Sequence, residues 1–583
     1  MILSSLNDYY YRLVNEGKDV SQPGFAPQGV HAALEISEDG SLNAVIDLRE
    51  AAPKGNKKVP AIRMLPSLGK ARTSGIEPNF LWDGPAYVLG RDDKGKPQRS
   101  TQCREAFHAL HRDILSPLDT EESRALLAFL ERDHAQHQLV EDNWELLASA
   151  YIVFRFRRRY LHEVPEFKAL WAARFDGGEN ETTGICLVTG EHTVIADLHP
   201  SIKGIWGGQS SGNALCSYNQ SAFTSYGKTQ NHNGPVGKSA AFAYTTVLNR
   251  LARDPEQSLR FGDSTVICWA SRASQVENNL FGFIMNPGDG TITDGVSSQS
   301  RIELMRRLVS GRPLAEAWPE LNPDVDLHIL SLKPNVARLS VGFYLHGKAG
   351  TFVERVCEWF TRLAVARRFE EEPEFPSIRQ LAFAVLGPHK KIDDVGRMSD
   401  DMLQTALRGG AYPAYLLPLC LQRLRSGDSF TSVRAGLLRA LLIKNYTLDP
   451  DKEATVSLNP DHPSPAYQLG RLFALLAGVQ RKAIGAAINA GIRECYYGSA
   501  SATPALVFPL LLRNAQNHIS KAKAYGYDKL IRDVLDKIDN AFPSHLDLAG
   551  QGLFALGFYH QRADGAVRQD DDRDDGAVEE KTV

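Results

Sequence analysis

Residues 204–251 combine the residue types from which nucleic-acid-binding surfaces are built. The segment GIWGGQSSGNALCSYNQSAFTSYGKTQNHNGPVGKSAAFAYTTVLNRL interleaves glycine, amide, hydroxyl, aromatic and a few basic side chains. Glycine lets a backbone approach a phosphate closely, and amide side chains hydrogen-bond to base edges. The rings of Tyr218, Phe223 and Tyr226 offer faces on which bases can stack. The segment therefore favours nucleic-acid binding, with an ordinary glycine-rich surface loop as the alternative.

Motifs that would indicate catalysis are weaker. The chain has no GxxxxGK[ST] loop and no HExxH helix. Asp197 and His199 could belong to a metal-dependent nuclease, but the string ADLHP at residues 196–200 fits a strand end followed by a turn. The widely spaced cysteines include no CxxC pair and no zinc spacing. We expect no catalytic residue, no metal site and no cofactor.

Six strings spread along the chain resemble the large subunit of type I-C CRISPR surveillance complexes (Cascade). Their order and spacing fit nearly the whole chain, and several long motifs rarely coincide by chance. The strings are CLVTG at residues 186–190, SYGK at 225–228, AAFAYTTVLNRL at 240–251, PNVARLSV at 334–341, SPAYQLGRLFALL at 464–476 and YYGSASATPALVFPLLL at 496–512.

The resemblance implies a non-catalytic DNA-binding subunit in antiviral defence. Such a subunit recognises the PAM, the short duplex motif beside the target, and promotes unwinding and R-loop formation, while guide RNA reads the target sequence. It also holds the non-target strand and helps to recruit a helicase-nuclease. The implied partners are the crRNA, the backbone, crRNA-processing and small subunits, the target duplex, the displaced single strand and the helicase-nuclease. A purely structural scaffold that contacts only proteins and guide RNA is a further alternative.

Residue type and position select candidates for contacts with the duplex. Amide and hydroxyl side chains suit base edges, whereas lysine and arginine neutralise phosphates. Besides the glycine-rich segment, we expect an exposed basic loop at residues 51–81, for which plain solvation of its charges is the alternative. The candidates for the PAM and duplex DNA are Lys70, Arg72, Gln209, Ser210, Asn213, Asn219, Lys228 and Lys238.

A second group of basic residues occurs in the C-terminal part, where they outnumber nearby acids. Their spacing allows one basic stripe on helix faces, which would hold the non-target strand with little sequence readout. A normal solvated helix face is the alternative. The candidates are Arg423, Arg434, Arg471, Arg481, Lys482 and Arg493.

Charge and composition place the chain among intracellular proteins. The net charge of -3 argues against a uniformly basic DNA binder, but residues 564–583 hold eight acidic and three basic side chains. This tail alone makes the net charge negative. No secretion signal or long apolar run occurs, and an odd number of cysteines fits a reducing compartment. We therefore expect a cytoplasmic protein.

Hydrophobic periodicity predicts the elements that position the candidates. Short β-like runs and helices alternate up to about residue 366, and apolar residues with a period near 3.6 dominate beyond residue 375. We expect an α+β fold with an N-terminal mixed α/β region, an antiparallel-rich sheet and a C-terminal all-α helical bundle. The expected parts are residues 1–180, 181–366, 376–563 and a disordered acidic tail at 564–583, with a linker at residues 369–375.

Overall fold

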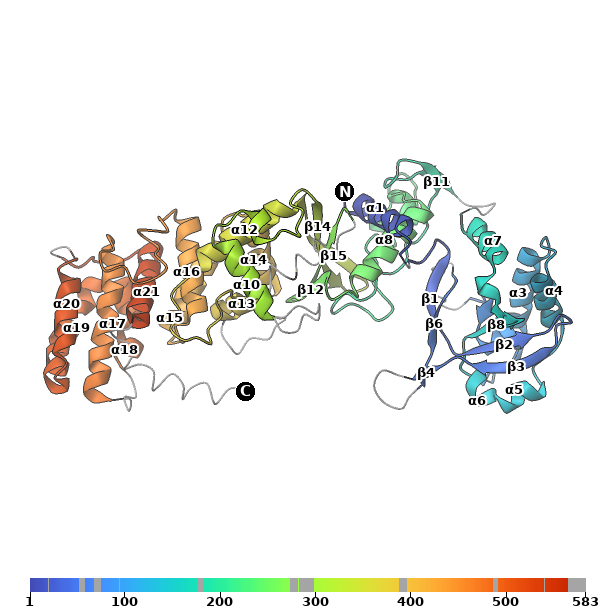
Figure 1. Cartoon of the computed structure of the whole chain (residues 1–583), viewed down its shortest axis with the longest axis horizontal. Helices are drawn as coiled ribbons and strands as arrows, with labels where there is room; N and C mark the ends of the chain where they lie inside the picture. Colours follow the sequence, from blue (N-terminus) through green and yellow to red (C-terminus); the bar gives the residue numbers. More distant parts are fainter. Residues whose placement is uncertain are drawn as a thin grey trace. The chain divides into compact units, whose positions relative to one another are not determined.

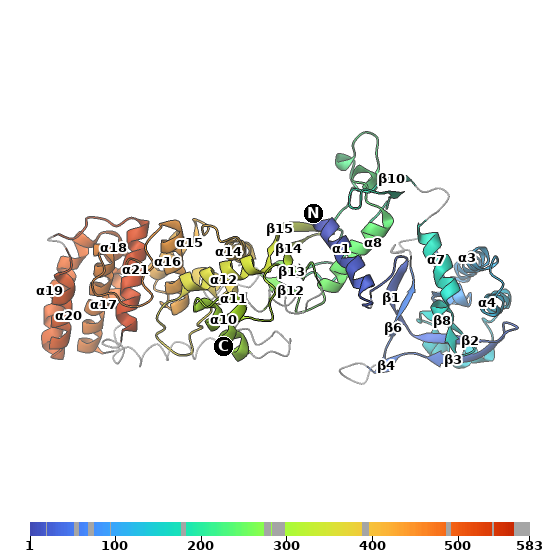
Figure 2. The same ribbon diagram turned by 45° about the horizontal axis from the view of Figure 1, so that its top comes forward.

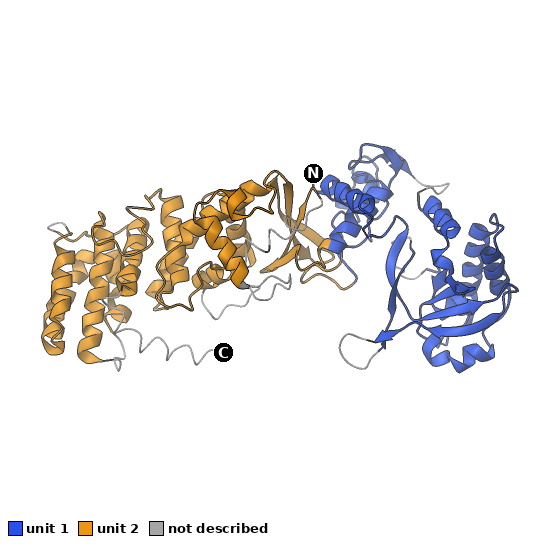
Figure 3. Ribbon diagram, viewed as in Figure 1, with its two compact units in different colours: residues 1–202, 211–250 blue, residues 203–210, 251–583 orange. Residues whose placement is uncertain are grey.

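The fold was analysed in a computed structural model. It describes residues 1–18, 20–51, 58–67, 75–93, 95–176, 182–272, 282, 298–386, 396–485, 491–538 and 541–564. Two compact units emerge, residues 1–202 with 211–250 (unit 1) and residues 203–210 with 251–583 (unit 2), as coloured in Figure 3. Sheets in the N-terminal region and mainly helices in the C-terminal region confirm the α+β prediction. In the described part of the chain, no helix has both the length and the apolar character needed to cross a membrane.

Unit 1 contains a five-stranded sheet with the order β3-β2-β8-β7, to which β9 adds beside β8. Strands β2 and β8 are parallel and the other pairs are antiparallel. Phe107, Phe129 and Phe154 are buried in one cluster, so α3 and α4 pack against the sheet (Figure 1). The strands are β2 (Ala32–Ile36), β3 (Leu42–Asp47), β7 (Trp82–Asp83), β8 (Ile152–Phe156) and β9 (Arg159–Tyr160); the helices are α2 (Pro85–Val88), α3 (Pro97–Leu115), α4 (Glu121–Glu131), α5 (Gln138–Asp142), α6 (Trp144–Leu147) and α7 (Pro165–Asp176).

The predicted basic loop at residues 51–81 is wrong in part. Strand β6 (Ala61–Pro66) lies within it and pairs with β1 (Phe25–Val30), and β5 (Lys58–Val59) pairs with β4 (Glu50–Ala51). Ala61 and Leu65 are buried on β6. These alternating apolar residues are a strand pattern that the surrounding lysines and prolines obscure.

The rest of unit 1 includes the elements that precede and follow the glycine-rich segment in the sequence. Strands β10 (Thr183–Ile185) and β11 (His192–Val194) form a hairpin, and helices α1 (Ile2–Asn15) and α8 (Lys238–Leu251) belong to the same unit. The short 3-10 helices Leu161–Glu163, Ser221–Phe223 and Gln230–Asn233 complete its elements. Tyr244, Leu248 and Leu251 lie at helical spacing in the sequence, and all three are fully buried on α8.

Unit 2 begins with an antiparallel sheet in the order β12-β13-β14-β15. Its strands are β12 (Ser258–Phe261), β13 (Ser264–Ala270), β14 (Asp326–Asn335) and β15 (Arg338–Lys348). Cys268, Ile329 and Phe343 of this sheet share one buried cluster with Phe352 and Val356 of α12 (Ala349–Leu363). Helices α10 (Ser298–Val309) and α11 (Leu314–Ala317) contribute to the same cluster.

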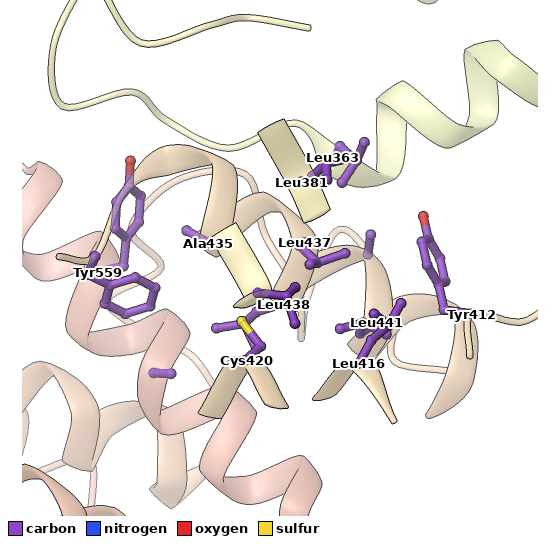
Figure 4. Close-up of a cluster of buried hydrophobic side chains, with 14 of the residues drawn as sticks. Leu363, Leu381, Tyr412, Leu416, Cys420, Ala435, Leu437, Leu438, Leu441 and Tyr559 are labelled. Carbon is purple, nitrogen blue, oxygen red and sulfur yellow. The ribbon is translucent and has the colours of Figure 1, made fainter. Parts of the chain in front are cut away.

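The C-terminal helices confirm the predicted all-α bundle. Leu381, Cys420, Leu438 and Tyr559 come from four different helices and lie in one apolar cluster (Figure 4). A Cβ atom at Gly470 would collide with the carbonyl oxygen of Phe554, so glycine permits the close crossing of α17 and α21. The helices are α13 (Ile378–Leu386), α14 (Gly396–Arg408), α15 (Leu416–Arg425), α16 (Ser432–Asn445), α17 (Pro465–Ile484), α18 (Ile492–Ala502), α19 (Pro504–Ala522), α20 (Tyr525–Leu535) and α21 (Leu548–Ala563).

The segment expected to be a linker is packed against unit 2. Phe375 is buried, and Glu374 forms an ion pair with Arg306 at 2.7 Å. A carboxylate oxygen of Glu372 accepts a hydrogen bond from the backbone N–H of Ser432 at the start of α16. Residues 369–375 are therefore bonded both to α10 and to the start of α16.

Candidate nucleic-acid interface

The chain between β11 and α8 forms the candidate interface of unit 1. Its base is closed by an antiparallel bridge in which Ile202 and Asn213 exchange two backbone hydrogen bonds, each of 2.8 Å. A second bridge joins Ile195 to Gly237 just before α8. Residues 219–230 lie between these closures and are all exposed. We call them the tip loop; Figure 2 shows the green chain projecting beside β10.

A tight turn forms the tip of this loop. The backbone N–H of Lys228 donates a hydrogen bond of 3.0 Å to the carbonyl oxygen of Ser225. Tyr226 and Gly227 between them have φ angles of 52° and 69°. Two consecutive positive φ values identify a type I′ turn, which glycine and asparagine favour and a bulky residue resists. The Tyr226 side chain is nevertheless placed there, and it is 97% exposed.

Asn233 holds the tip loop in shape. Its Nδ2 atom donates hydrogen bonds to the carbonyl oxygens of Lys228 and Gln230, at 3.2 and 2.9 Å. Its Oδ1 atom accepts a hydrogen bond of 2.9 Å from the backbone N–H of Ser225. One half-buried amide thus satisfies three backbone groups of the turn, which keeps the aromatic tip organised without a strand on either side.

The predicted contacts of unit 1 have different environments. Asn219 and Lys228 are exposed on the tip loop, whereas Lys238 is half-buried where α8 begins. Asn213 differs from the expectation, because its residue is only 1% exposed. Its backbone closes the base of the loop, and its side chain is buried. Asn213 is therefore part of the support of the loop and does not offer its amide to a base.

The remaining predicted contacts of the glycine-rich segment belong to unit 2. Gln209 and Ser210 are exposed. Close to them in sequence is a feature that the sequence interpretation missed: the guanidinium carbon of Arg260 lies 3.6 Å from the centre of the Trp206 ring, and Trp206 is 52% exposed. The signal available in the sequence was a tryptophan placed among glycines. Lys70 and Arg72 lie outside the described residues.

Arg434 and Arg471, two of the residues predicted for the basic stripe of the helical part, are only 5% and 6% exposed. The Nε atom of Arg434 donates to the carbonyl oxygen of Ala384 at 2.8 Å. Arg471 donates to the carbonyl oxygen of Pro460 at 2.9 Å and to the Gln561 side chain at 3.0 Å. Burial lowers the pKa of both guanidinium groups. These arginines satisfy acceptors inside the bundle.

The other four stripe candidates are only partly available. Arg423 forms an ion pair with Asp428 at 2.6 Å, and Arg493 donates a hydrogen bond to the carbonyl oxygen of Asp428. Arg481 is half-buried and Lys482 is exposed, both at the C-terminal end of α17. Of the six candidates, two are therefore buried and two are bonded to Asp428. The remaining two, Arg481 and Lys482, form a short basic end of α17.

The residues of the nuclease alternative have separate partners. The carboxylate of Asp197 lies 2.9 Å from Nε2 of His232, whereas Nδ1 of His199 hydrogen-bonds the Tyr244 hydroxyl at 2.7 Å. Burial lowers the pKa of His199 to about 4, so it is neutral at pH 7. No group of three His, Cys, Asp or Glu side chains suited to a metal occurs among the residues described. The geometry thus gives the nuclease alternative no support.

A serine pattern in the same segment also lacks its structural context. Residues 208–212, GQSSG, have the GxSxG spacing of a nucleophile elbow, which requires a sharp turn from a strand into a helix. Here the chain continues into the bridge at Asn213, and α8 begins only at Lys238. Ser210 is therefore an exposed loop residue, and the spacing alone indicates no hydrolase.

Comparison with known families agrees with the resemblance seen in the sequence. The family model described as CRISPR-associated protein (Cas_Csd1) matches residues 6–565. No curated protein matches the chain. The match spans both units, including the tip loop and the helical bundle.

Proposed function

The chain belongs to the Csd1 family of CRISPR-associated proteins, the large subunits of type I-C complexes, and on that premise we propose that its tip loop recognises the PAM in duplex DNA. The observation that carries this proposal is the placement of Tyr226, 97% exposed on a braced type I′ turn. An aromatic ring exposed to solvent buries no apolar surface and so contributes little to the stability of the fold. A base stacked on the ring would bury that surface.

The tip loop offers three kinds of contact to a duplex. Tyr226 provides a ring face for stacking, and Lys228 provides a cation for a phosphate. The amides of Asn219 and Gln220 are exposed and can donate to or accept from base edges. Because guide RNA reads the target, a few such contacts beside the target are sufficient for the protein's share of recognition.

Strand separation follows from the same geometry in this proposal. A ring inserted beside the first target base pair unstacks that step at a cost of a few kcal/mol. Stacking of a base on the ring returns about 1–3 kcal/mol, and pairing of guide RNA with the freed strand replaces the lost base pairs. The Asn233 hydrogen bonds keep Tyr226 in place, so the loop need not be ordered when DNA binds.

The wider family role is part of the same proposal. The subunit binds and does not cleave, helps to seat the guide-bearing backbone, and takes part in recruiting the helicase-nuclease. Gln209 and Ser210 remain candidates for further duplex contacts. For the displaced strand, we retain Arg481 and Lys482 at the end of α17, with Arg423 and Arg493 contributing only if their bonds at Asp428 are exchanged for phosphate.

The test compares binding of the assembled complex to target duplexes with matched and scrambled PAMs. We expect Asn219→Ala/Gln220→Ala to reduce the preference for the matched PAM by at least about thirtyfold, because each of the two base-edge contacts is worth about 1–3 kcal/mol of discrimination. The matched control is Gln98→Ala/Gln102→Ala, which removes two exposed amides from α3 of the same unit.

Two results would count against the proposal. An unchanged PAM preference in the tip-loop variant would favour the scaffold alternative or another PAM site on the complex. An equal loss in the α3 control would show that the effect is not specific to the loop.

A further inference from the structure

The hairpin of β8 and β9 presents an arginine-rich turn that the proposed function does not use. Residues 155–160 have the sequence RFRRRY. Phe156 pairs with Arg159 across the hairpin, so Arg157 and Arg158 are the two residues of its turn. Their φ angles are 47° and 66°. This is again the type I′ geometry, in which Asn-Gly is favoured and two arginines are sterically costly.

Carboxylates anchor one half of the arginines in this hairpin. Arg155 forms an ion pair with Glu35 of β2 at 2.7 Å. Arg157 forms ion pairs with Glu38, at 3.3 Å, and with Glu121 at the start of α4. The second oxygen of Glu35 accepts a hydrogen bond of 3.0 Å from the backbone N–H of Arg158. These acids hold the turn in its strained shape and neutralise Arg155 and Arg157.

The side chains of Arg158 and Arg159 have no carboxylate partner among the described residues. Arg158 and Arg159 are both exposed, and neither side chain forms an ion pair or hydrogen bond with a residue that the structure describes. A protein that needed only a tight turn would place Asn-Gly here, so the strain calls for a reason outside the hairpin. Three glutamates hold the strained turn in place, and the turn exposes the guanidinium groups of Arg158 and Arg159. This arrangement is typical of a binding site.

We propose that Arg158 and Arg159 bind the phosphodiester backbone of a nucleic acid. The planar guanidinium group donates paired hydrogen bonds to phosphate oxygens, and its charge is permanent near neutral pH. The glutamates beneath the turn keep Arg155 and Arg157 out of this contact, so two phosphates are contacted and no base is read. This inference does not depend on the tip loop, because it concerns a different element and a contact without sequence preference.

The experiment uses the purified full-length chain and two labelled probes, a single-stranded RNA and a DNA duplex, both of mixed sequence. Binding is measured from about 50 to 200 mM salt. We expect Arg158→Ala/Arg159→Ala to weaken binding and to reduce the slope of log K against log salt. The reduction is about 0.9 for each lost duplex phosphate contact or about 0.7 for each single-strand contact, so about 1.8 or 1.4 for both.

A control of equal charge is available in the same unit. Arg112 and Arg124 are exposed and paired with Glu131 and Asp119, so Arg112→Ala/Arg124→Ala removes the same two charges from occupied arginines. We expect its salt slope to stay within about 0.5 of the wild type. Arg158→Lys/Arg159→Lys retains both charges and should retain most of the slope, since lysine also neutralises phosphate.

The single variant Arg158→Gly separates binding from folding. Glycine relieves the positive φ, so this variant should unfold at the same temperature as the wild type or higher. It removes one guanidinium group and should show about half of the slope change.

The probes identify the source of the phosphate. A change confined to RNA assigns the site to guide RNA, a change confined to the duplex assigns it to target DNA, and a change for both supports a general phosphate site. An unchanged slope with both probes overturns the proposal, as does an equal change in the Arg112→Ala/Arg124→Ala control. Because this assay contains no PAM, its outcome is independent of the PAM test.

Discussion

The tip loop of unit 1 and the helical bundle of unit 2 use polar side chains in opposite ways. Both regions have an excess of amide or basic residues in the sequence. In the loop these side chains and Tyr226 face solvent, whereas in the bundle Arg434, Arg439 and Arg471 face inward. A loop has few apolar neighbours that could cover a side chain. In a helical bundle, carbonyl groups at helix ends and in the connecting segments are buried and need hydrogen-bond donors. Composition alone does not distinguish the two uses.

Arg439 shows how far the inward use extends. Its guanidinium donates to the carbonyl oxygens of Ala454, Thr361 and Arg362, at 2.5, 2.8 and 3.0 Å. Burial lowers its pKa to about 10, so it remains charged at pH 7. It also donates to the carbonyl oxygen of Pro450, which is the fourth carbonyl that it contacts. Arg439 on α16 thus connects this helix to α12 and to the chain that follows α16. Such a residue contributes to stability and is not available to DNA.

The largest expected effect tests this inward use. Arg471→Ala should lower the free energy of unfolding by about 3 kcal/mol, because the buried side-chain oxygens of Gln468 and Gln561 both lose the donor that Arg471 provides. Urea unfolding of the full chain measures the loss. DNA binding per folded molecule should be unchanged. A stable variant with weakened DNA binding would instead return Arg471 to the non-target-strand surface and break the comparison.

A buried polar side chain in unit 1 sharpens the comparison through pH. The backbone N–H of Leu81 donates to Nε2 of His111, and Nδ1 of His111 donates to the carbonyl oxygen of Phe107, so the ring is held neutral. Burial lowers the pKa of His111 to about 3. The unfolded chain, with an ordinary histidine pKa, takes up the proton first as pH falls, so stability decreases below about pH 6.5.

The size of this pH effect is predicted. From pH 7 to pH 5 this one histidine should cost about 2 kcal/mol of unfolding free energy. Urea titrations at the two pH values measure it, and His111→Gln should reduce the difference by that amount. Equal pH dependence of wild type and variant would mean that His111 is charged or accessible in the folded protein.

Exposed groups should show the reverse pattern of effects. Tyr226→Ala is expected to weaken binding of the assembled complex to a PAM-containing duplex by about 1–2 kcal/mol, about five- to thirtyfold, through lost stacking. Its free energy of unfolding should change by less than about 0.5 kcal/mol, as for an ordinary surface substitution. Filter binding and urea unfolding give the two numbers. Loss of stability without loss of binding would place the ring in the fold instead of the interface.

Asn233 connects the two patterns, because it is polar, half-buried and not itself a DNA contact. Asn233→Ala removes the three hydrogen bonds that brace the turn, each worth about 1 kcal/mol at most in a partly exposed loop. We expect proteolysis within residues 219–230 to become faster and duplex binding to weaken about threefold to tenfold, since the loop must then be ordered on binding. Unchanged proteolysis would show that the brace is dispensable.

The smallest effect concerns the backbone of the turn. Tyr226→Asn preserves the positive φ with a residue that tolerates it, so stability should rise by up to about 1 kcal/mol while stacking is lost. Thermal unfolding and duplex binding, measured on the same sample, test whether stability and binding change in opposite directions. A destabilised variant would indicate that the tyrosine ring has packing partners in the folded chain.

The sequence predicted the elements better than the environments of single residues. The β-like runs at residues 42–50 and 150–158 contain β3 and β8, and the apolar period near 3.6 corresponds to α8 and to the all-α C-terminal part. The strand β6 was missed because its flanking lysines and prolines resemble a loop. The acidic tail was predicted to be disordered over residues 564–583, and all of these except residue 564 lie outside the described residues.

What the sequence determined by itself was therefore the family, the α+β class and the segment in which an exposed loop occurs, since these depend on local patterns and long motifs. Only the tertiary structure decided which polar side chains face solvent. Asn213 and Asn219 are both asparagines six positions apart, yet one closes the loop and the other lies on it. Burial depends on neighbours that are distant in sequence, such as Ile202 beside Asn213 and Gln561 beside Arg471, and no local pattern contains that information.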